Sequence, residues 1–202
     1  MKRFLLVALA AALGIGAVSC RDGSDSKTKD GGEFNFRKTT WGMSREQVKA
    51  SEDTEPTGDR PEVVTYRGEF EGIPVIIGYV FDGDKLARAG YLMRGSYQDP
   101  NSYISDYDKV KESLIKSYGS PAEDNVVWDE GEEVQDPALF GESVCAGKLV
   151  YSTMWSDGVT VIRENLSGED GKCSHGVTFE SVELFIKKTI QDSESSQSPP
   201  NE

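Results

Sequence analysis

Residues 63–95, VVTYRGEFEGIPVIIGYVFDGDKLARAGYLMRG, alternate strand-forming residues with turn signals, and no other pattern constrains the fold of this chain as strongly. Gly72 lies near the first reversal of the chain. Asp82-Gly83-Asp84 marks the second and places a glycine where a hairpin needs a positive φ. The segment therefore predicts three antiparallel strands.

A second pattern, with a helical period, follows at 104–118, where apolar residues recur at spacings of three, four and seven. This spacing predicts an amphipathic helix. Asn101 or Ser102 marks its start, and Gly119 followed by Pro121 marks its end.

A shorter helix is predicted earlier in the chain, from Ser44 to about Glu52. Ser44 and Gln47 have the spacing of a capping box, in which each side chain satisfies a backbone donor of the other residue. We expect the neighbouring Met43 to fill the core, and the three tryptophans to pack in the core or on the sheet, namely Trp41, Trp128 and Trp155.

Strand patterns return after the long helix. They cover residues 126–128, 148–155, 159–166 and 177–186. Ser156-Asp157-Gly158 gives the clearest hairpin signal, and the Gly168–Gly171 segment gives a looser one.

The element order is thus helix, three strands, helix, and three or four strands, which resembles one αβ unit used twice. It predicts an α+β fold, an antiparallel sheet with two helices on one face. Residues 34–190 are long enough for a single domain with its own core. Residues 191–202 are polar and rich in proline and serine, so we expect a disordered tail.

The first twenty residues, MKRFLLVALAAALGIGAVSC, have the layout of a bacterial export signal. Lys2 and Arg3 precede an apolar run from Phe4 to Ile15, and small residues follow. Because a transmembrane helix needs about 20 apolar residues, this run is too short to span a bilayer. We expect residues 1–19 to be removed.

The AVSC ending resembles the lipobox of bacterial lipoproteins, although Ala17 stands where leucine is usual. The resemblance implies that Cys20 carries a diacylglyceryl group and an acyl chain such as palmitate. The protein would then be a membrane-anchored lipoprotein of the cell envelope, facing the periplasm or the exterior. Residues 20–33 would form the lipidated cysteine and a flexible tether. Ordinary secretion is the alternative.

The chain has three cysteines, and assigning Cys20 to lipid leaves Cys145 and Cys173 as an even pair. In an oxidising envelope such a pair predicts a disulfide, which would stabilise the fold by about 3 kcal/mol. Two free thiols or a redox couple are the alternatives, but the CxxC-like spacing of a redox couple is absent.

The formal charge of −13 argues against nucleic acid as a partner. Binding to phosphate backbones depends on clustered Lys and Arg, which this acidic chain lacks. An acidic surface instead keeps an exported protein soluble.

Signals for catalysis, metals and cofactors are weak, and the sequence predicts no such residue. His175 is the one histidine. A Cys173–His175 dyad is conceivable, but a histidine in a surface turn is the preferred interpretation. Four carboxylates near Trp128 could support a hydrolase, although solvated loop charge explains them as well, and they are Glu130, Glu132, Glu133 and Asp136.

Trp41-Gly42-Met43-Ser44, followed by Gln47-Val48, resembles the helix opening of the BamE/SmpA group of envelope lipoproteins. Tyr118-Gly119-Ser120-Pro121 resembles the Gly-x-Pro that closes the helical part of the α-β-β unit, which the β-lactamase inhibitor protein carries in tandem. Here the opening occurs only in the first unit and the Gly-x-Pro only in the second. The order Trp-Gly-Met-Ser, Tyr-Val-Phe-Asp, Tyr-Gly-x-Pro, a single Trp and then a strand ending in Trp resembles a set of uncharacterised exported bacterial proteins.

These resemblances imply a non-enzymatic, lipid-anchored envelope protein that binds a protein partner, or assists assembly, through the open face of its sheet. A lipid-anchored hydrolase that uses the 130–136 loop is the alternative from another class. An enzyme inhibitor is a further alternative, resting on fold analogy.

Overall fold

Two successive runs of a helix and four strands build the part of the chain that the computed structural model describes, residues 35–186. The first run comprises α1 (Arg45–Ser51), β1 (Gly58–Arg60), β2 (Val63–Phe70), β3 (Ile73–Asp82) and β4 (Lys85–Met93). The second comprises α2 (Asn101–Tyr118), β5 (Glu123–Trp128), a 3₁₀ turn η1 (Pro137–Leu139), α3 (Phe140–Cys145), β6 (Leu149–Ser156), β7 (Thr160–Glu169), β8 (Lys172–Ser181) and a π-helical turn η2 (Val182–Ile186). The predicted export signal, Cys20, the predicted tether and the predicted 191–202 tail lie outside the described residues.

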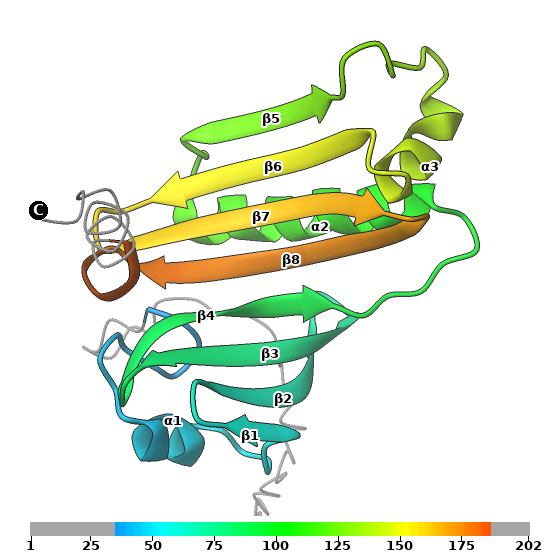
Figure 1. Ribbon diagram of the computed structural model, residues 1–202. Coiled ribbons are helices and arrows are strands. Elements are labelled where there is room, and N and C mark those ends of the chain that lie inside the picture. The colour runs from blue at the N-terminus through cyan, green and yellow to red at the C-terminus, as the bar shows by residue number, and fades with distance from the viewer. Residues whose placement is uncertain (1–34, 187–202) are drawn as a thin grey trace, which may run out of the picture.

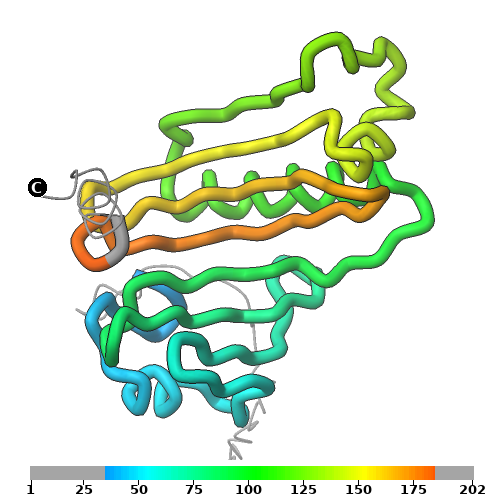
Figure 2. The backbone as a smooth tube through the Cα atoms, in the orientation of Figure 1, coloured from blue at the N-terminus to red at the C-terminus, as the bar shows by residue number. Residues whose placement is uncertain are grey.

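All eight strands form one antiparallel sheet in the order β1-β2-β3-β4-β8-β7-β6-β5. The last strands of the two runs, β4 and β8, therefore meet in the middle of the sheet, where Arg88 lies opposite Glu180 and Leu92 opposite Gly176 (Figure 1). The tube in Figure 2 follows the chain from the end of β4 past the β7–β8 hairpin to α2. The predicted α+β class and antiparallel sheet are confirmed, and each unit contributes four strands to the sheet.

The helices pack on one face of this sheet. Val48 of α1 and Val110 of α2 belong to the same buried cluster as Tyr91 of β4 and Phe179 of β8. In Figure 1, α2 lies behind β6, β7 and β8. We call this covered side the core face, and the opposite side the open face.

Both predicted helices have the expected ends. The Ser44 side chain accepts a hydrogen bond from the Gln47 amide, and the Gln47 side chain accepts one from the Ser44 amide, so the capping box is present. Helix α2 begins at Asn101, but no side chain caps it. The Asn101 side chain instead accepts from the Gly141 amide at 3.0 Å and holds α3 against the start of α2.

Two connections differ from their predictions. The β7–β8 hairpin, predicted to be the looser one, turns through Asp170 and Gly171 alone, both with positive φ (51° and 76°). An Asp-Gly pair in this conformation matches the right-handed twist of the strands, which favours a two-residue turn. The 156–158 hairpin, predicted to be clearer, needs the longer connection 157–159.

The start of β8 also differs from its prediction. The strand covers Lys172–Ser181 rather than 177–186, and residues 182–186 form a helical turn. Glycine and polar residues in Cys173-Ser174-His175-Gly176 obscure the strand pattern, but pairing with β7 extends it to the hairpin. The three-residue strand β1 and the short helix α3 were not predicted, because neither is long enough to show a period.

The tryptophans pack as expected. Trp155 is 3 % exposed, and its indole N–H donates to the Gly119 carbonyl at 2.9 Å. Trp41 is partly buried against the main core, and Trp128 packs edge-on against Phe140. Met43 is also partly buried against that core.

The segment before α1 joins the two halves of the sheet. Phe36 is 2 % exposed, and its ring lies 5.0 Å from that of Tyr91 on β4 and 4.9 Å from that of Phe179 on β8. Burying a phenylalanine side chain contributes about 1.5–3 kcal/mol. Phe36 therefore stabilises the joint at which β4 meets β8.

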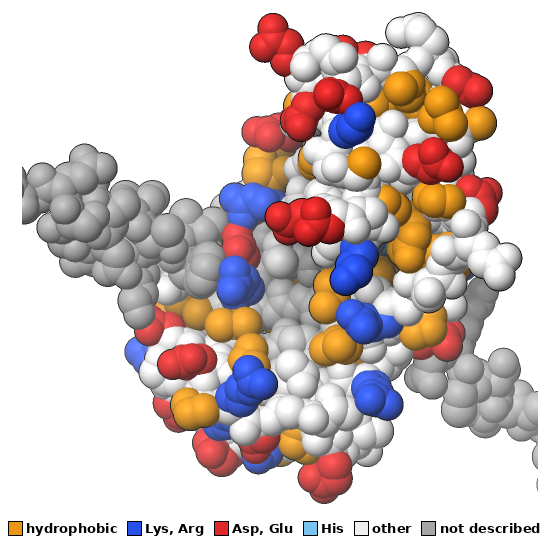
Figure 3. Space-filling model, turned by 45° about the vertical axis from the view of Figure 1, so that its right-hand side comes forward, with side chains coloured by type: hydrophobic (Ala, Val, Ile, Leu, Met, Phe, Trp, Pro, Cys, Tyr) orange, Lys and Arg blue, Asp and Glu red, His pale blue; other side chains and the backbone are white. Residues whose placement is uncertain are grey.

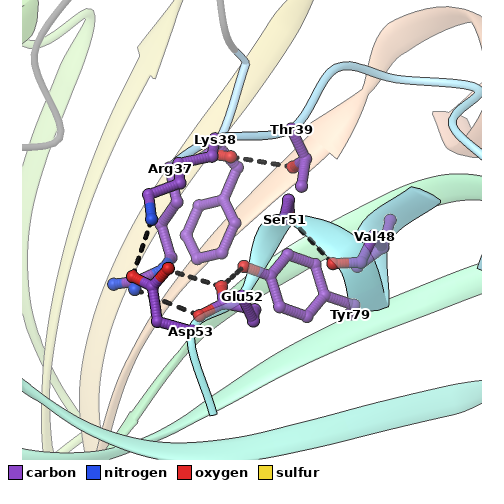
Figure 4. A network of polar contacts seen from close by, with 9 residues as sticks. Arg37, Lys38, Thr39, Val48, Ser51, Glu52, Asp53 and Tyr79 are labelled. Atoms are coloured by element: carbon purple, nitrogen blue, oxygen red, sulfur yellow. Dashed lines mark hydrogen bonds and ion pairs between the residues drawn. The ribbon is translucent and has the colours of Figure 1, made fainter. Parts of the chain in front are cut away.

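A polar network fixes this segment to α1 (Figure 4). The Arg37 guanidinium donates to both carboxylate oxygens of Glu52, at 3.0 and 3.3 Å, and the Tyr79 hydroxyl donates to the same carboxylate. The Glu52 side chain is 8 % exposed. Lys38 and Asp53 form a neighbouring ion pair at 2.7 Å, but the Asp53 side chain is 86 % exposed.

We expect Glu52→Ala to lower the free energy of unfolding by about 2 kcal/mol, because it removes the largely buried carboxylate that pairs with the Arg37 guanidinium and accepts from the Tyr79 hydroxyl. Urea unfolding of a protein that begins at residue 20 measures this loss. Asp53→Ala is the matched control and should keep the wild-type midpoint, since its ion pair is solvated. Equal midpoints for both variants would show that the Arg37–Glu52 pair does not hold the segment.

Candidate functional site

The open face of the sheet combines basic and apolar side chains. Along each central strand the buried positions point to the core face, so the alternate positions form the open face. Leu92 on β4 is 40 % exposed there. It lies opposite Ile76 on β3, and Met154 on β6 lies opposite Arg163 on β7, both pairs on this face.

Arginines occupy the open face on both sides of the β4–β8 junction, namely Arg67 on β2, Arg88 on β4 and Arg163 on β7. The Glu180 carboxylate on β8 lies between two of them. One of its oxygens is 3.6 Å from the Arg88 guanidinium, and the other pairs with the Arg163 guanidinium. Cross-strand pairing thus holds two arginines in place over the centre of the sheet.

Three glycines leave the backbone without side chains in the middle of this face: Gly78, Gly90 and Gly176. Gly90 is required by packing, since a Cβ there would lie 2.3 Å from the Val177 carbonyl oxygen on β8. All three glycines are partly exposed. The centre of the open face is therefore flat and surrounded by arginine and aliphatic side chains.

Charge is distributed unevenly over the surface. In Figure 3, Lys and Arg side chains lie among hydrophobic ones across the middle of the molecule, where a few acidic side chains lie beside them, and further acidic side chains lie toward its upper and lower ends. The basic side chains of this middle band contrast with the formal net charge of −13 of the whole chain.

His175 does not lie in a surface turn, so the prediction for this residue is wrong. Its position in β8 alternates with Val177 and Phe179, so its side chain points to the core face, where it is 3 % exposed. His175 Nε2 lies 2.9 Å from an oxygen of Glu164 on β7, a residue that is 0 % exposed. The sequence does carry a signal for Glu164, because a charged residue stands between Ile162 and Leu166 in the apolar alternation of its strand.

Burial perturbs both partners of this pair. It raises the pKa of Glu164 to about 9 and lowers the pKa of His175 to about 4. The Glu164–His175 pair therefore carries no net charge near neutral pH. Burial also raises the pKa of Tyr107, whose ring lies 5.7 Å from the imidazole.

The predicted disulfide joins Cys145 of α3 to Cys173 of β8, across 28 residues of sequence. It ties α3 to the β7–β8 hairpin. Because Cys173 is bonded to Cys145, it cannot act as the nucleophile of a Cys173–His175 dyad while the disulfide is intact.

The acidic loop has structural contacts. Glu132 pairs with Lys148 at 2.6 Å, and Asp136 accepts a hydrogen bond from the Ala138 amide and so caps η1. Glu130 and Glu133 are exposed. These contacts do not favour the hydrolase alternative.

Within residues 35–186, no group of three or more His, Cys, Asp or Glu is placed to hold a metal ion. In the same range, no helix is long and apolar enough to cross a bilayer.

Comparison of the chain with protein-family models, with curated proteins and with solved structures found no significant match. The similarity to the BamE/SmpA group and to the β-lactamase inhibitor protein thus rests on the motifs quoted above.

Proposed function

We propose that this chain is a non-catalytic protein-binding module of the bacterial envelope, anchored by lipid on Cys20, and that its open face is the binding surface. The observation that carries the proposal is the cluster of arginine and aliphatic side chains over the centre of the sheet, including Leu92, Arg88 and Arg163. Arginine is enriched in protein interfaces, and an apolar core with a polar rim is their usual arrangement.

The chemistry of this face defines the partner. A protein that presents an apolar centre with carboxylates at its rim would complement Leu92 and the surrounding arginines. The strongly negative remainder of the surface would orient such a partner toward the open face. The same charge makes nucleic acid an unsuitable partner.

We expect Leu92→Asp to lower recovery of the partner by more than about tenfold when lipidated protein is used for affinity capture from the envelope. The substitution places a carboxylate in the apolar centre, where interface substitutions cost most. Quantitative mass spectrometry of the captured proteins measures the effect.

Val126→Asp on the edge strand β5 is the matched control, because Val126 is an exposed aliphatic residue, at 53 %, outside the open face. It should preserve recovery, and both variants should unfold at the wild-type midpoint. Equal recovery with both variants would contradict binding through the open face. A Cys20→Ser arm tests the anchor, since loss of the acylated atom should move the protein from the membrane to the soluble fraction.

A further inference from the structure

A pocket of about 380 Å³ opens at the end of the sheet, where the β4–α2 connection, the start of α2, the disulfide and the β7–β8 hairpin meet. Its volume lies in the range of small-molecule sites, about 300–1,000 Å³. None of the residues that define the open face lines it. The pocket is therefore a separate feature, and its function does not depend on the proposed protein binding.

One residue in the wall of the pocket, His175, carries a buried ring nitrogen without a partner. His175 lines the pocket, its side chain is 2 % exposed, and its Nε2 is engaged with Glu164. Its Nδ1 has no hydrogen-bond partner among the described residues. Buried polar groups in proteins are nearly always paired, so an unpaired ring nitrogen beside a pocket points to a ligand.

The protonation state of the neighbouring Glu164 determines whether His175 Nδ1 carries a proton. Burial raises the pKa of Glu164 to about 9, so the carboxyl group keeps a proton at neutral pH and donates it to His175 Nε2. A neutral imidazole that accepts at Nε2 carries its own proton on Nδ1. If the proton moves to the imidazole instead, both ring nitrogens are protonated. In either arrangement Nδ1 is a donor, and it requires an acceptor.

The charges at the pocket favour an anion. Arg94 and Lys172 line it, and neither side chain forms an ion pair with another described residue. Asp106 is the single carboxylate in the lining, and it accepts a hydrogen bond from the Tyr97 hydroxyl. This hydrogen bond raises the pKa of Tyr97 to about 12. Two cationic groups against one anionic group give a net positive lining on an acidic protein.

Aromatic side chains supply the remaining walls. The rings of Tyr97 and Tyr103 meet edge to face, with centroids 4.9 Å apart, and both line the pocket. Flat ligands pack well against such rings. We propose that the pocket binds a small aromatic carboxylate, whose carboxylate accepts from His175 Nδ1–H and whose ring packs against Tyr103. Arg94 and Lys172 attract its charge from the rim.

Imidazole NMR tests the proposal directly, because His175 is the one histidine of the chain and gives a single set of ring signals in tag-free protein. In the free protein we expect a proton on Nδ1. Benzoate should shift the Nδ1 signals in a saturable way. Benzamide, which has the same size and no charge, should not shift them, and inorganic phosphate should bind more weakly than benzoate.

The combined Arg94→Ala and Lys172→Ala variant should bind benzoate roughly tenfold more weakly, through loss of the attracting charge. Lys116→Ala, an exposed lysine of α2 outside the pocket, is the matched control and should bind as the wild type does. An unprotonated Nδ1, equal binding of benzamide, tighter binding of phosphate, or no saturable shift up to about 10 mM benzoate would each overturn the proposal.

Discussion

Gly168→Ala is expected to destabilise the protein by about 3 kcal/mol, because β7 and α3 touch at this glycine. A Cβ on Gly168 would lie 2.3 Å from the Val144 carbonyl oxygen and 2.6 Å from the Cys145 Cα. Both are backbone atoms, so no side-chain rotation relieves the overlap. The disulfide to β8 and the contact with the start of α2 hold α3 in place, and overpacking of this kind costs about 1–3 kcal/mol or more.

Gly78→Ala is the matched control, since Gly78 is also a strand glycine. A Cβ on Gly78 meets no atom within 4 Å, and the residue lies on the open face of β3. This variant should unfold near the wild-type guanidinium midpoint, whereas Gly168→Ala should unfold at a clearly lower concentration. If the two midpoints coincide, α3 does not pack against β7 as described.

Local signals account for the elements that the sequence predicts well. The capping box at Ser44 and the Gly119 stop are fixed by neighbouring residues, and both helices end close to the predicted positions. The alternation over 63–95 likewise marks β2, β3 and β4, because each strand buries one face.

The arrangement of these elements could not be predicted in the same way. Pairing of β4 with β8 joins Leu92 to Gly176, and the packing of Phe36 across that joint depends on residues far along the chain. Neither contact leaves a periodic pattern. Helix α3 depends on Asn101 and on the disulfide rather than on its own six residues.

The sequence predicts part of the open face. The positions of Arg88 and Arg163 follow from the strand alternation, but their shared contact with Glu180 requires the β4–β8–β7 order. The prediction of a surface turn for His175 is wrong because the predicted strand begins at residue 177, whereas β8 begins at Lys172. Once that strand begins at Lys172, the alternation of His175 with Val177 places the imidazole on the core face. Its partner Glu164 needs the register between β7 and β8.

The free energy of unfolding is expected to fall by about 1 kcal/mol per pH unit as the pH rises from 6.5 toward 9. Glu164 has a pKa near 9 in the folded protein and 4.5 as its ordinary value. Between these values the folded state holds a proton that the unfolded state has lost, so rising pH favours unfolding. Since Glu164 is 0 % exposed, solvent does not screen this effect.

At lower pH the buried His175 has the opposite effect on the free energy of unfolding. Its pKa is about 4 in the folded protein and 6.5 as its ordinary value, so the unfolded state holds the extra proton in that range and rising pH favours folding. Between about 4.5 and 6.5 the two contributions oppose each other, and the stability should change little with pH. Above 6.5 only the Glu164 contribution remains, with a total loss of about 3 kcal/mol by pH 9.

Glu164→Gln should remove the decline above pH 6.5, because an amide of the same shape can still donate to His175 Nε2 but does not titrate. Urea unfolding at pH 6.5, 7.5 and 8.5 gives the slope for each protein. Glu69→Gln, an exposed glutamate of β2, is the control and should keep the wild-type slope. An unchanged slope in Glu164→Gln would mean that the buried pair is not the origin of the decline, and would remove the basis for assigning the shared proton to Glu164.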